Sequence, residues 1–155
     1  MKPIAVFATG ICLLILCGYK PADPGKTDTY YFTNDIGLAN YIVLEKNGDS
    51  AKGTYYGVEI NRDTAMVYFE AGIAGKIDSS HVSFTLDNFR FSYKPLYKNP
   101  GNKSYITNEN KFPLVYVFHP SFFGKFIMGD MLHLNRTYDI YDNRADDMLF
   151  FKISE

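Results

Sequence analysis

Apolar and polar residues alternate along most of the chain from residue 28 onward, with the period of two that is typical of strands with one buried face. The alternation predicts strands near residues 39–46, 53–60 and 64–71, and then a hairpin that turns at 78–80 and whose second arm reaches Tyr93. No apolar series with helical spacing runs beyond about two turns. The pattern therefore predicts an all-β protein.

The long second arm of this hairpin contains a break in the alternation at Asp87 and Asn88. The apolar series that includes Phe84 and the series that includes Phe89 have opposite parity, so a regular strand would place them on opposite faces. One extra residue in a strand restores a common face. We therefore predict a β-bulge or a strand bend here, of the kind that helps to close barrels.

The last third of the chain begins with a polar stretch at residues 94–112, which contains two Pro and one Gly and predicts a long surface loop that covers one end of the sheet. The apolar run FPLVYVF is expected to form a strand and HPSFFG a turn, and residues 125–136 alternate around Gly129 and Asp130. The closing strands are expected at 137–141 and 148–153, joined by the turn DNRADD.

These elements predict an antiparallel up-and-down β-barrel of about eight strands, with a β-sandwich as the alternative. Composition supports β structure, since thirteen Tyr and thirteen Phe make 17% of the chain aromatic. We favour the barrel because full closure leaves no exposed edge on strands that are so rich in aromatic residues.

The N-terminal segment differs in character from the rest. Lys2 precedes a mostly apolar run at residues 4–16, which is too short to cross a bilayer comfortably and has the length of a secretory signal peptide. Pro and Gly residues then keep the following stretch extended and unpacked. The alternative is that the apolar run forms a buried N-terminal strand or helix.

The end of this run, Leu14-Ile15-Leu16-Cys17, resembles the lipobox of bacterial lipoproteins, from which it departs at Leu16, where the family has a small residue. The resemblance implies cleavage before Cys17, lipidation of Cys17, anchoring to a membrane through acyl chains, and a location in the bacterial cell envelope. The domain organisation would then be a signal peptide at 1–16, a lipidated flexible tether at 17–27 and one β-barrel domain at 28–155. Ordinary secretion with a free Cys17 is the alternative. In both cases Cys12 is removed, and the body contains no thiol for disulfides, metals or catalysis.

The body carries a second resemblance. The stretches FEAGIAGKIDSSHVSF, KFIMGDMLHLNRTY and MLFFKI are similar to those of small lipocalin-like, or calycin-type, bacterial lipoproteins, over roughly residues 53–155. The resemblance implies an up-and-down barrel with a possible internal cavity and no fixed activity.

Residues with catalytic or metal-binding potential are few. The formal net charge of −1 argues against nucleic acid as a partner. The three histidines, His81, His119 and His133, lack the spacing of a metal motif, and no Gly-x-Ser-x-Gly sequence occurs. We therefore predict no catalytic residue, metal or cofactor, and no enzyme activity.

One acidic cluster could in principle bind Ca²⁺ through carboxylate oxygens. It lacks the residue order of an EF-hand, and Arg144 lies in its middle, so a solvated turn is the preferred interpretation. Its members are Asp139, Asp142, Asp146 and Asp147.

Two classes of function remain. The first is a binding module that holds a small apolar or amphipathic ligand in the barrel interior or mouth, with the long loop as a lid. The second is a protein-interaction module, such as an inhibitor, immunity or assembly factor, that binds an envelope protein through the barrel exterior and the 94–112 loop. For the first class the predicted ligand-binding residues are Tyr55, Tyr68, Phe91, Tyr93, Tyr105 and Tyr116.

Overall fold

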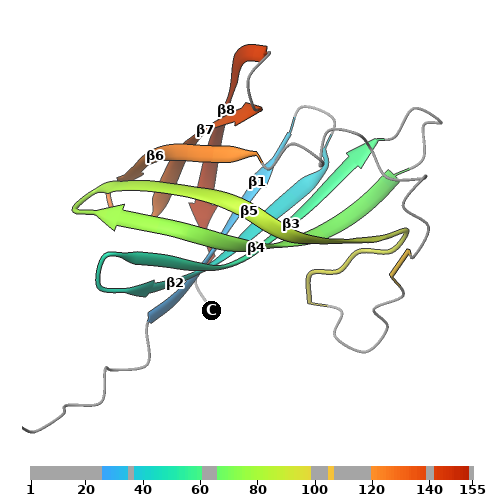
Figure 1. Ribbon diagram of the computed structural model, residues 1–155, viewed down its shortest axis with the longest axis horizontal. Helices are drawn as coiled ribbons and strands as arrows, with labels where there is room; N and C mark the ends of the chain where they lie inside the picture. The colour runs from blue at the N-terminus through green and yellow to red at the C-terminus, as the bar shows by residue number, and fades with distance from the viewer. Residues whose placement is uncertain are drawn as a thin grey trace, which may run out of the picture.

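The computed structural model describes residues 26–34, 37–60, 66–98, 105–106, 120–138 and 142–153, and these residues form a closed antiparallel barrel (Figure 1). Each strand pairs with the next along the chain, and β8 returns to β1. The predicted all-β, up-and-down barrel of eight strands is thereby confirmed, and the sandwich alternative is excluded. The strands are β1 (Lys26–Thr33), β2 (Ala39–Asn47), β3 (Ser50–Ile60), β4 (Met66–Asp78), β5 (His81–Ser92), β6 (Ser121–Ile127), β7 (Met131–Tyr138) and β8 (Asp142–Lys152).

Alternation along the strands separates an apolar interior from an outer wall. Along β2, for example, Ile42 and Leu44 are fully buried, whereas their neighbours Tyr41 and Val43 point outward. The interior is dominated by rings, whose large area supplies most of the apolar burial. Its largest buried apolar side chains are Tyr30, Tyr55, Phe69, Phe122, Phe150, Ile42, Leu44, Leu86, Leu132 and Leu134.

The predicted irregularity in β5 is a β-bulge. The pairing of β4 with β5 shifts register between Glu70 and Gly72, and Asn88 has a positive φ of 52°. The extra residue turns Phe89 and Phe91 to the same inner side as Phe84, so all three rings reach the core.

Four of the predicted elements differ from those observed. The closing strand expected at 137–141 is not a separate element, because its first two residues end β7, and residues 139–141 lie outside the described residues. The expected strand at 64–71 and the first arm of the following hairpin are one continuous strand, β4, because Gly72 and Gly75 interrupt the side-chain pattern without ending the backbone ladder. The expected turn at HPSFFG is wrong for its last four residues, which begin β6. The expected turn DNRADD belongs to β8, which begins at Asp142.

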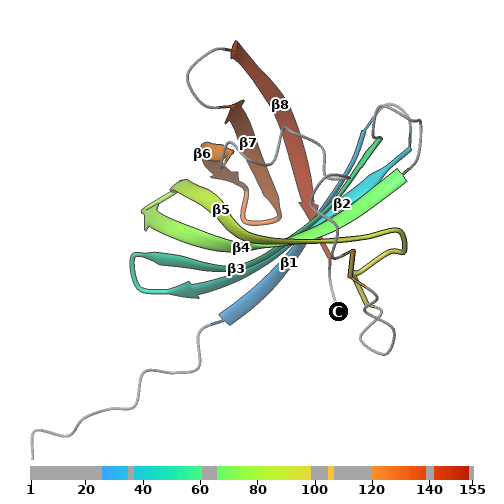
Figure 2. The same cartoon turned by 45° about the vertical axis from the view of Figure 1, so that its right-hand side comes forward.

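The two ends of the barrel are named here by their strands. The base is the end where β1 begins and β8 ends, and the mouth is the end where β1 ends and β8 begins. In Figure 2, β1 begins at the base of the barrel. Within the described residues, no helix has the length and apolar character needed to cross a bilayer.

Candidate functional site

The middle of the barrel is filled by packed rings. The Tyr55 ring centroid lies 5.7 Å from that of Phe69 and 5.5 Å from that of Phe122, and Phe84 stacks on Phe122 at 4.9 Å. Two of the predicted ligand-binding residues, Tyr55 and Phe91, lie in this core and are 1% and 4% exposed. At this level their rings pack against the other side chains of the core.

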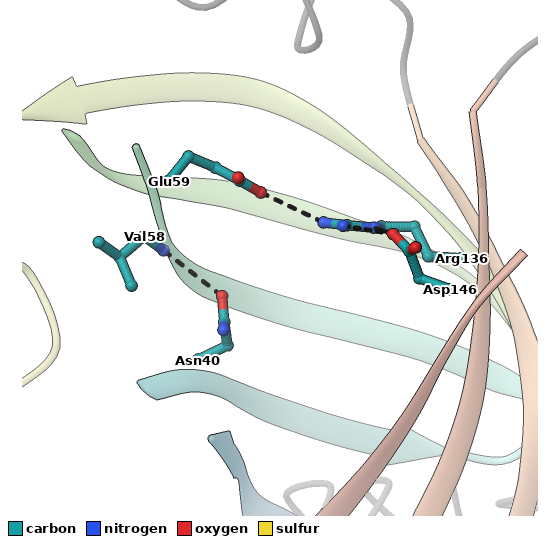
Figure 3. Close-up of polar contacts among 5 residues, drawn as sticks. All are labelled: Asn40, Val58, Glu59, Arg136 and Asp146. Carbon is teal, nitrogen blue, oxygen red and sulfur yellow. Dashed lines mark hydrogen bonds and ion pairs between the residues drawn. The ribbon is translucent and has the colours of Figure 1, made fainter. Parts of the chain in front are cut away.

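Polar side chains converge at the mouth, above this core (Figure 3). Arg136 on β7 donates from Nε and Nη2 to Oδ2 of Asp146 on β8, at 3.0 and 2.5 Å. Its Nη1 donates to Oε1 of Glu59 on β3 at 3.3 Å. The guanidinium therefore links two carboxylates from strands that are far apart in the sequence.

The mouth contains a cavity of about 360 Å³ with an apolar floor and a charged rim. Phe32 and Met148 form part of this floor, and the centroid of the Phe32 ring lies 5.4 Å from that of the Phe150 ring in the core below. Asn40, which is 7% exposed, accepts a hydrogen bond from the Val58 N–H at 3.4 Å through its side-chain oxygen. The complete lining is Phe32, Asn34, Asn40, Val58, Glu59, Arg136, Asp146, Asp147 and Met148.

Burial determines the acidity of the rim. Desolvation raises the pKa of Glu59 above its ordinary value, and the charge and hydrogen bond of Arg136 only partly offset this shift. With all groups ionised, the two carboxylates of Glu59 and Asp146 outnumber the single guanidinium of Arg136. The mouth therefore favours a ligand that brings positive charge or hydrogen-bond donors.

The base carries a different polar cluster around the buried Asp28. Its carboxylate contacts Lys152 Nζ at 2.7 Å and Lys46 Nζ at 3.1 Å, and the Tyr30 hydroxyl donates to it at 3.5 Å. Lys46 Nζ also lies 4.0 Å from the centroid of the Phe126 ring. These groups form ion pairs and hydrogen bonds with one another. Their role is therefore to close the core at the base of the barrel without leaving a buried charge unpaired.

The segment after β5 packs on the outer wall. Tyr97 stacks on Tyr41 with ring centroids 3.9 Å apart, and Leu96 is buried. The Tyr105 hydroxyl donates to the buried carboxylate of Glu70 at 2.5 Å, and Arg90 pairs with the same carboxylate. In the described part of the predicted surface loop, Tyr97 and Tyr105 thus contact the exterior of the barrel, and Ile106 packs against its core.

The remaining predicted ligand-binding residues do not meet at one place. Tyr68 lies on the outer face of β4 beside Met66, Tyr93 is 51% exposed after β5, and Tyr105 contacts Glu70. Tyr116 and the predicted lipidation site Cys17 lie outside the described residues. The six predicted residues therefore do not line one cavity in the part of the chain that is described.

The candidate metal ligands are dispersed as well. His81 and His133 belong to the outer wall, and His133 pairs there with Asp147. His119 and Asp139 lie outside the described residues. Among the residues that the structure describes, no three His, Cys, Asp or Glu side chains gather as a metal site.

Two larger hollows, of about 550 and 480 Å³, lie on the outer wall. The first includes Phe123, His81 and His133, and the second lies beside the bulge at Asn88. The mouth differs from both because its charged side chains, Glu59, Arg136 and Asp146, come from three strands that converge at one end of the barrel. Barrel mouths are common ligand sites, and the mouth is therefore the candidate site.

Sequence reasoning missed the polar residues of the mouth, although the sequence contains a signal for them. Each continues an inward-facing apolar series: Arg136 follows Leu132 and Leu134, and Asn40 precedes Ile42 and Leu44 at the same parity. A polar residue at an inward position marks the place where a strand leaves the core for an end of the barrel.

No protein-family model, curated protein or solved structure matches this chain significantly. The eight-stranded antiparallel barrel is compatible with a lipocalin-like body.

Proposed function

We propose that this protein is a binding module that holds a small amphipathic ligand in the mouth of its barrel. The observation that supports the proposal is the arrangement of Glu59, Arg136 and Asp146 above the apolar floor formed by Phe32 and Met148. The apolar part of the ligand would lie on this floor, and a cationic head would contact the carboxylates of Glu59 and Asp146. The volume of about 360 Å³ falls near the lower end of small-molecule pockets.

The test compares three probes of similar size: hexylamine, hexanol and hexanoate. Calorimetric titration of the purified barrel is expected to show hexylamine binding most tightly and hexanoate most weakly. Glu59→Gln and Asp146→Asn should each weaken hexylamine binding about tenfold, the equivalent of one charge-assisted contact. Asp49→Asn, in the exposed turn between β2 and β3 at the base, is the matched control. Equal affinity for all three probes would contradict the proposal.

The pH dependence of hexylamine binding follows from Glu59. Because burial raises its pKa, Glu59 becomes ionised only above the ordinary value of 4.5. Hexylamine binding should therefore strengthen as the pH rises through this raised pKa, and Glu59→Gln should remove that rise. A profile that is flat between pH 4 and 8 in the unmodified protein would contradict the assignment of Glu59 as a ligand contact.

We further propose that the barrel is a lipoprotein of a bacterial cell envelope, anchored through acyl chains on Cys17. The proposal is supported by the lipobox-like residues Leu14-Ile15-Leu16-Cys17 and by the entry of the chain at the base. In this arrangement the mouth, at the far end of the strands, is directed away from the membrane.

One observation favours a second candidate function, that of a protein-interaction module. Phe123, Leu149 and Phe151 are 49%, 37% and 44% exposed on the outer wall of β6 and β8. Exposed apolar residues of this size are typical of interaction surfaces. A photocrosslinker at Phe123 in the intact envelope should then capture one defined protein, whereas the same crosslinker at the exposed Lys52 should not.

A further inference from the structure

The seam between β1 and β8 closes over a short length only. In the described residues its ladder consists of Tyr30 opposite Lys152 and Tyr31 opposite Phe151, extended at the base by the hydrogen bond from Ile153 N–H to Thr29 C=O. The next bonded pair would be Thr33 with Leu149, and it is not formed. Figure 2 shows β8 diverging from β1 beyond this point, toward the mouth.

The direction of the hydrogen bonds identifies the backbone groups at the open part of the seam. Ile153 N–H donates toward β1, whereas Lys152 N–H donates to Asp130 at the start of β7. Since successive residues of a strand point their backbone groups to opposite sides, Asp147 and Leu149 direct their N–H and C=O groups toward the open side. The described residues provide no hydrogen-bond partner for these groups.

The side chains along this edge determine which strand would fit. Met148 and Asp146 face the mouth, and Phe32 lies across the gap on β1. An added strand would alternate in the same way, with one side chain over the apolar floor of the cavity and its neighbours on the outer wall. The carboxylates of Glu59 and Asp146 near this edge repel an acidic side chain and attract a basic one. The same charges protect the edge from pairing with a second copy.

We propose that the ligand of the mouth is an extended peptide with an apolar and a basic residue two positions apart, on one face, which adds to the β8 edge as a strand. Its backbone would bond to Asp147 and Leu149, an apolar side chain would contact Phe32 and Met148, and a basic side chain would meet Glu59 and Asp146. This is strand addition, in which the main chain supplies affinity and the side chains supply specificity. The proposal rests on the proposed function of the mouth and specifies its ligand.

The experiment uses synthetic blocked pentapeptides and the full barrel. The peptide Thr-Val-Thr-Lys-Thr, which places Val and Lys on one face, is expected to bind, and the counterpart with Glu in place of Lys is expected to bind at least tenfold more weakly. In hydrogen exchange the amides of Asp147 and Leu149 should gain protection in the complex. Methylation of the peptide nitrogens that face β8 should abolish binding, and methylation of the alternate nitrogens should have little effect. Leu149→Pro, which removes an N–H from the open edge only, should weaken binding of the peptide at least tenfold.

The outcomes separate the two proposals. If hexylamine binds and the peptide does not, or if methylation at either set of nitrogens has the same effect, strand addition is wrong and the small-ligand function stands. If neither hexylamine nor the peptide binds, both proposals are wrong. The methylated peptides act on the unmodified protein, so this part of the test does not depend on whether Leu149→Pro folds.

Discussion

At the residue scale, Gly124 in β6 shows how closely the strands approach. A Cβ at this position would overlap the backbone carbonyl of His133 on β7, and backbone atoms cannot move aside as the end of a side chain can. The absence of a side chain thus allows β6 and β7 to pair where the barrel wall curves.

Gly124→Ala is therefore expected to lower the free energy of unfolding by at least about 2 kcal/mol, because the backbone must shift to relieve the overlap. The control is Gly48→Ala in the turn between β2 and β3. No atom lies within 4 Å of a Cβ at Gly48, so only its positive φ of 57° is unfavourable, at about 1 kcal/mol. Urea denaturation measures both values, and equal losses would show that β6 and β7 can separate locally at little cost.

A second residue-scale prediction concerns Tyr30 and Asp28 at the base. Burial, with the negative charge of Asp28 beside it, raises the pKa of Tyr30 to about 12 from 10.0. A raised pKa in the folded state means that this contribution to stability is complete below pH 10 and is lost as the pH rises toward 12, by roughly 2–3 kcal/mol. The free energy of unfolding of Tyr30→Phe should fall less steeply across this window than that of the unmodified protein. Parallel curves would contradict the assignment.

Asp28 produces the opposite dependence in acid. Burial alone would raise its pKa, but the hydrogen bonds and charges of Lys152 and Lys46 outweigh burial and hold the pKa below 3.8. Its contribution to stability is therefore present above pH 3.8 and is lost as the pH falls through the lowered pKa. Asp28→Asn should destabilise the barrel at pH 7 and show a weaker further loss below pH 4. Chemical denaturation at a series of pH values measures both effects. If the free energy of unfolding of Asp28→Asn falls as steeply below pH 4 as that of the unmodified protein, this explanation is wrong.

At the scale of elements, alternation predicted most of the strands, and the parity change at Asn88 located the bulge of β5. The boundaries of β6 and β8 were not predictable, because SFFG and DNRADD contain the small and polar residues that also form turns. What makes them strands is their pairing with β7, which local sequence does not encode.

The segment after β5 provides an element-scale prediction. Its Tyr105 hydroxyl is a hydrogen-bond donor to Glu70, a carboxylate that is only 2% exposed. Tyr105→Phe keeps the ring beneath Arg90 but removes the donor, and should lower the free energy of unfolding by about 1–2 kcal/mol. Tyr93→Phe, at an exposed tyrosine of the same segment, should change it by less than about 0.5 kcal/mol. Thermal unfolding of the two variants provides the comparison, and equal effects would mean that the contact with Glu70 adds nothing to stability.

At the scale of the whole molecule, closure of the barrel creates the candidate site. Glu59 and Arg136 are separated by 77 positions in the chain, and they meet only because β3 and β7 face each other across the mouth. The sequence could identify each as a polar residue at an inward position, but their distance depends on the register of every strand between them. This is why the fold was predictable and the site was not.

The path of the chain leads to a prediction about orientation. If Cys17 carries the anchor, the residues between it and Lys26 can extend by at most about 30 Å, so the base stays near the membrane. β3 rises from base to mouth over 11 residues, which places the mouth roughly 25–30 Å farther out at the usual strand tilt. In vesicles that carry headgroup quenchers, a fluorophore at Asp49 in the basal turn should be quenched more than one at Met66 beside the mouth. Mass spectrometry should find acyl chains on Cys17, and Cys17→Ser should leave the protein in the soluble fraction. Equal quenching at the two positions would show that the barrel lies on its side, with the mouth accessible to lipid.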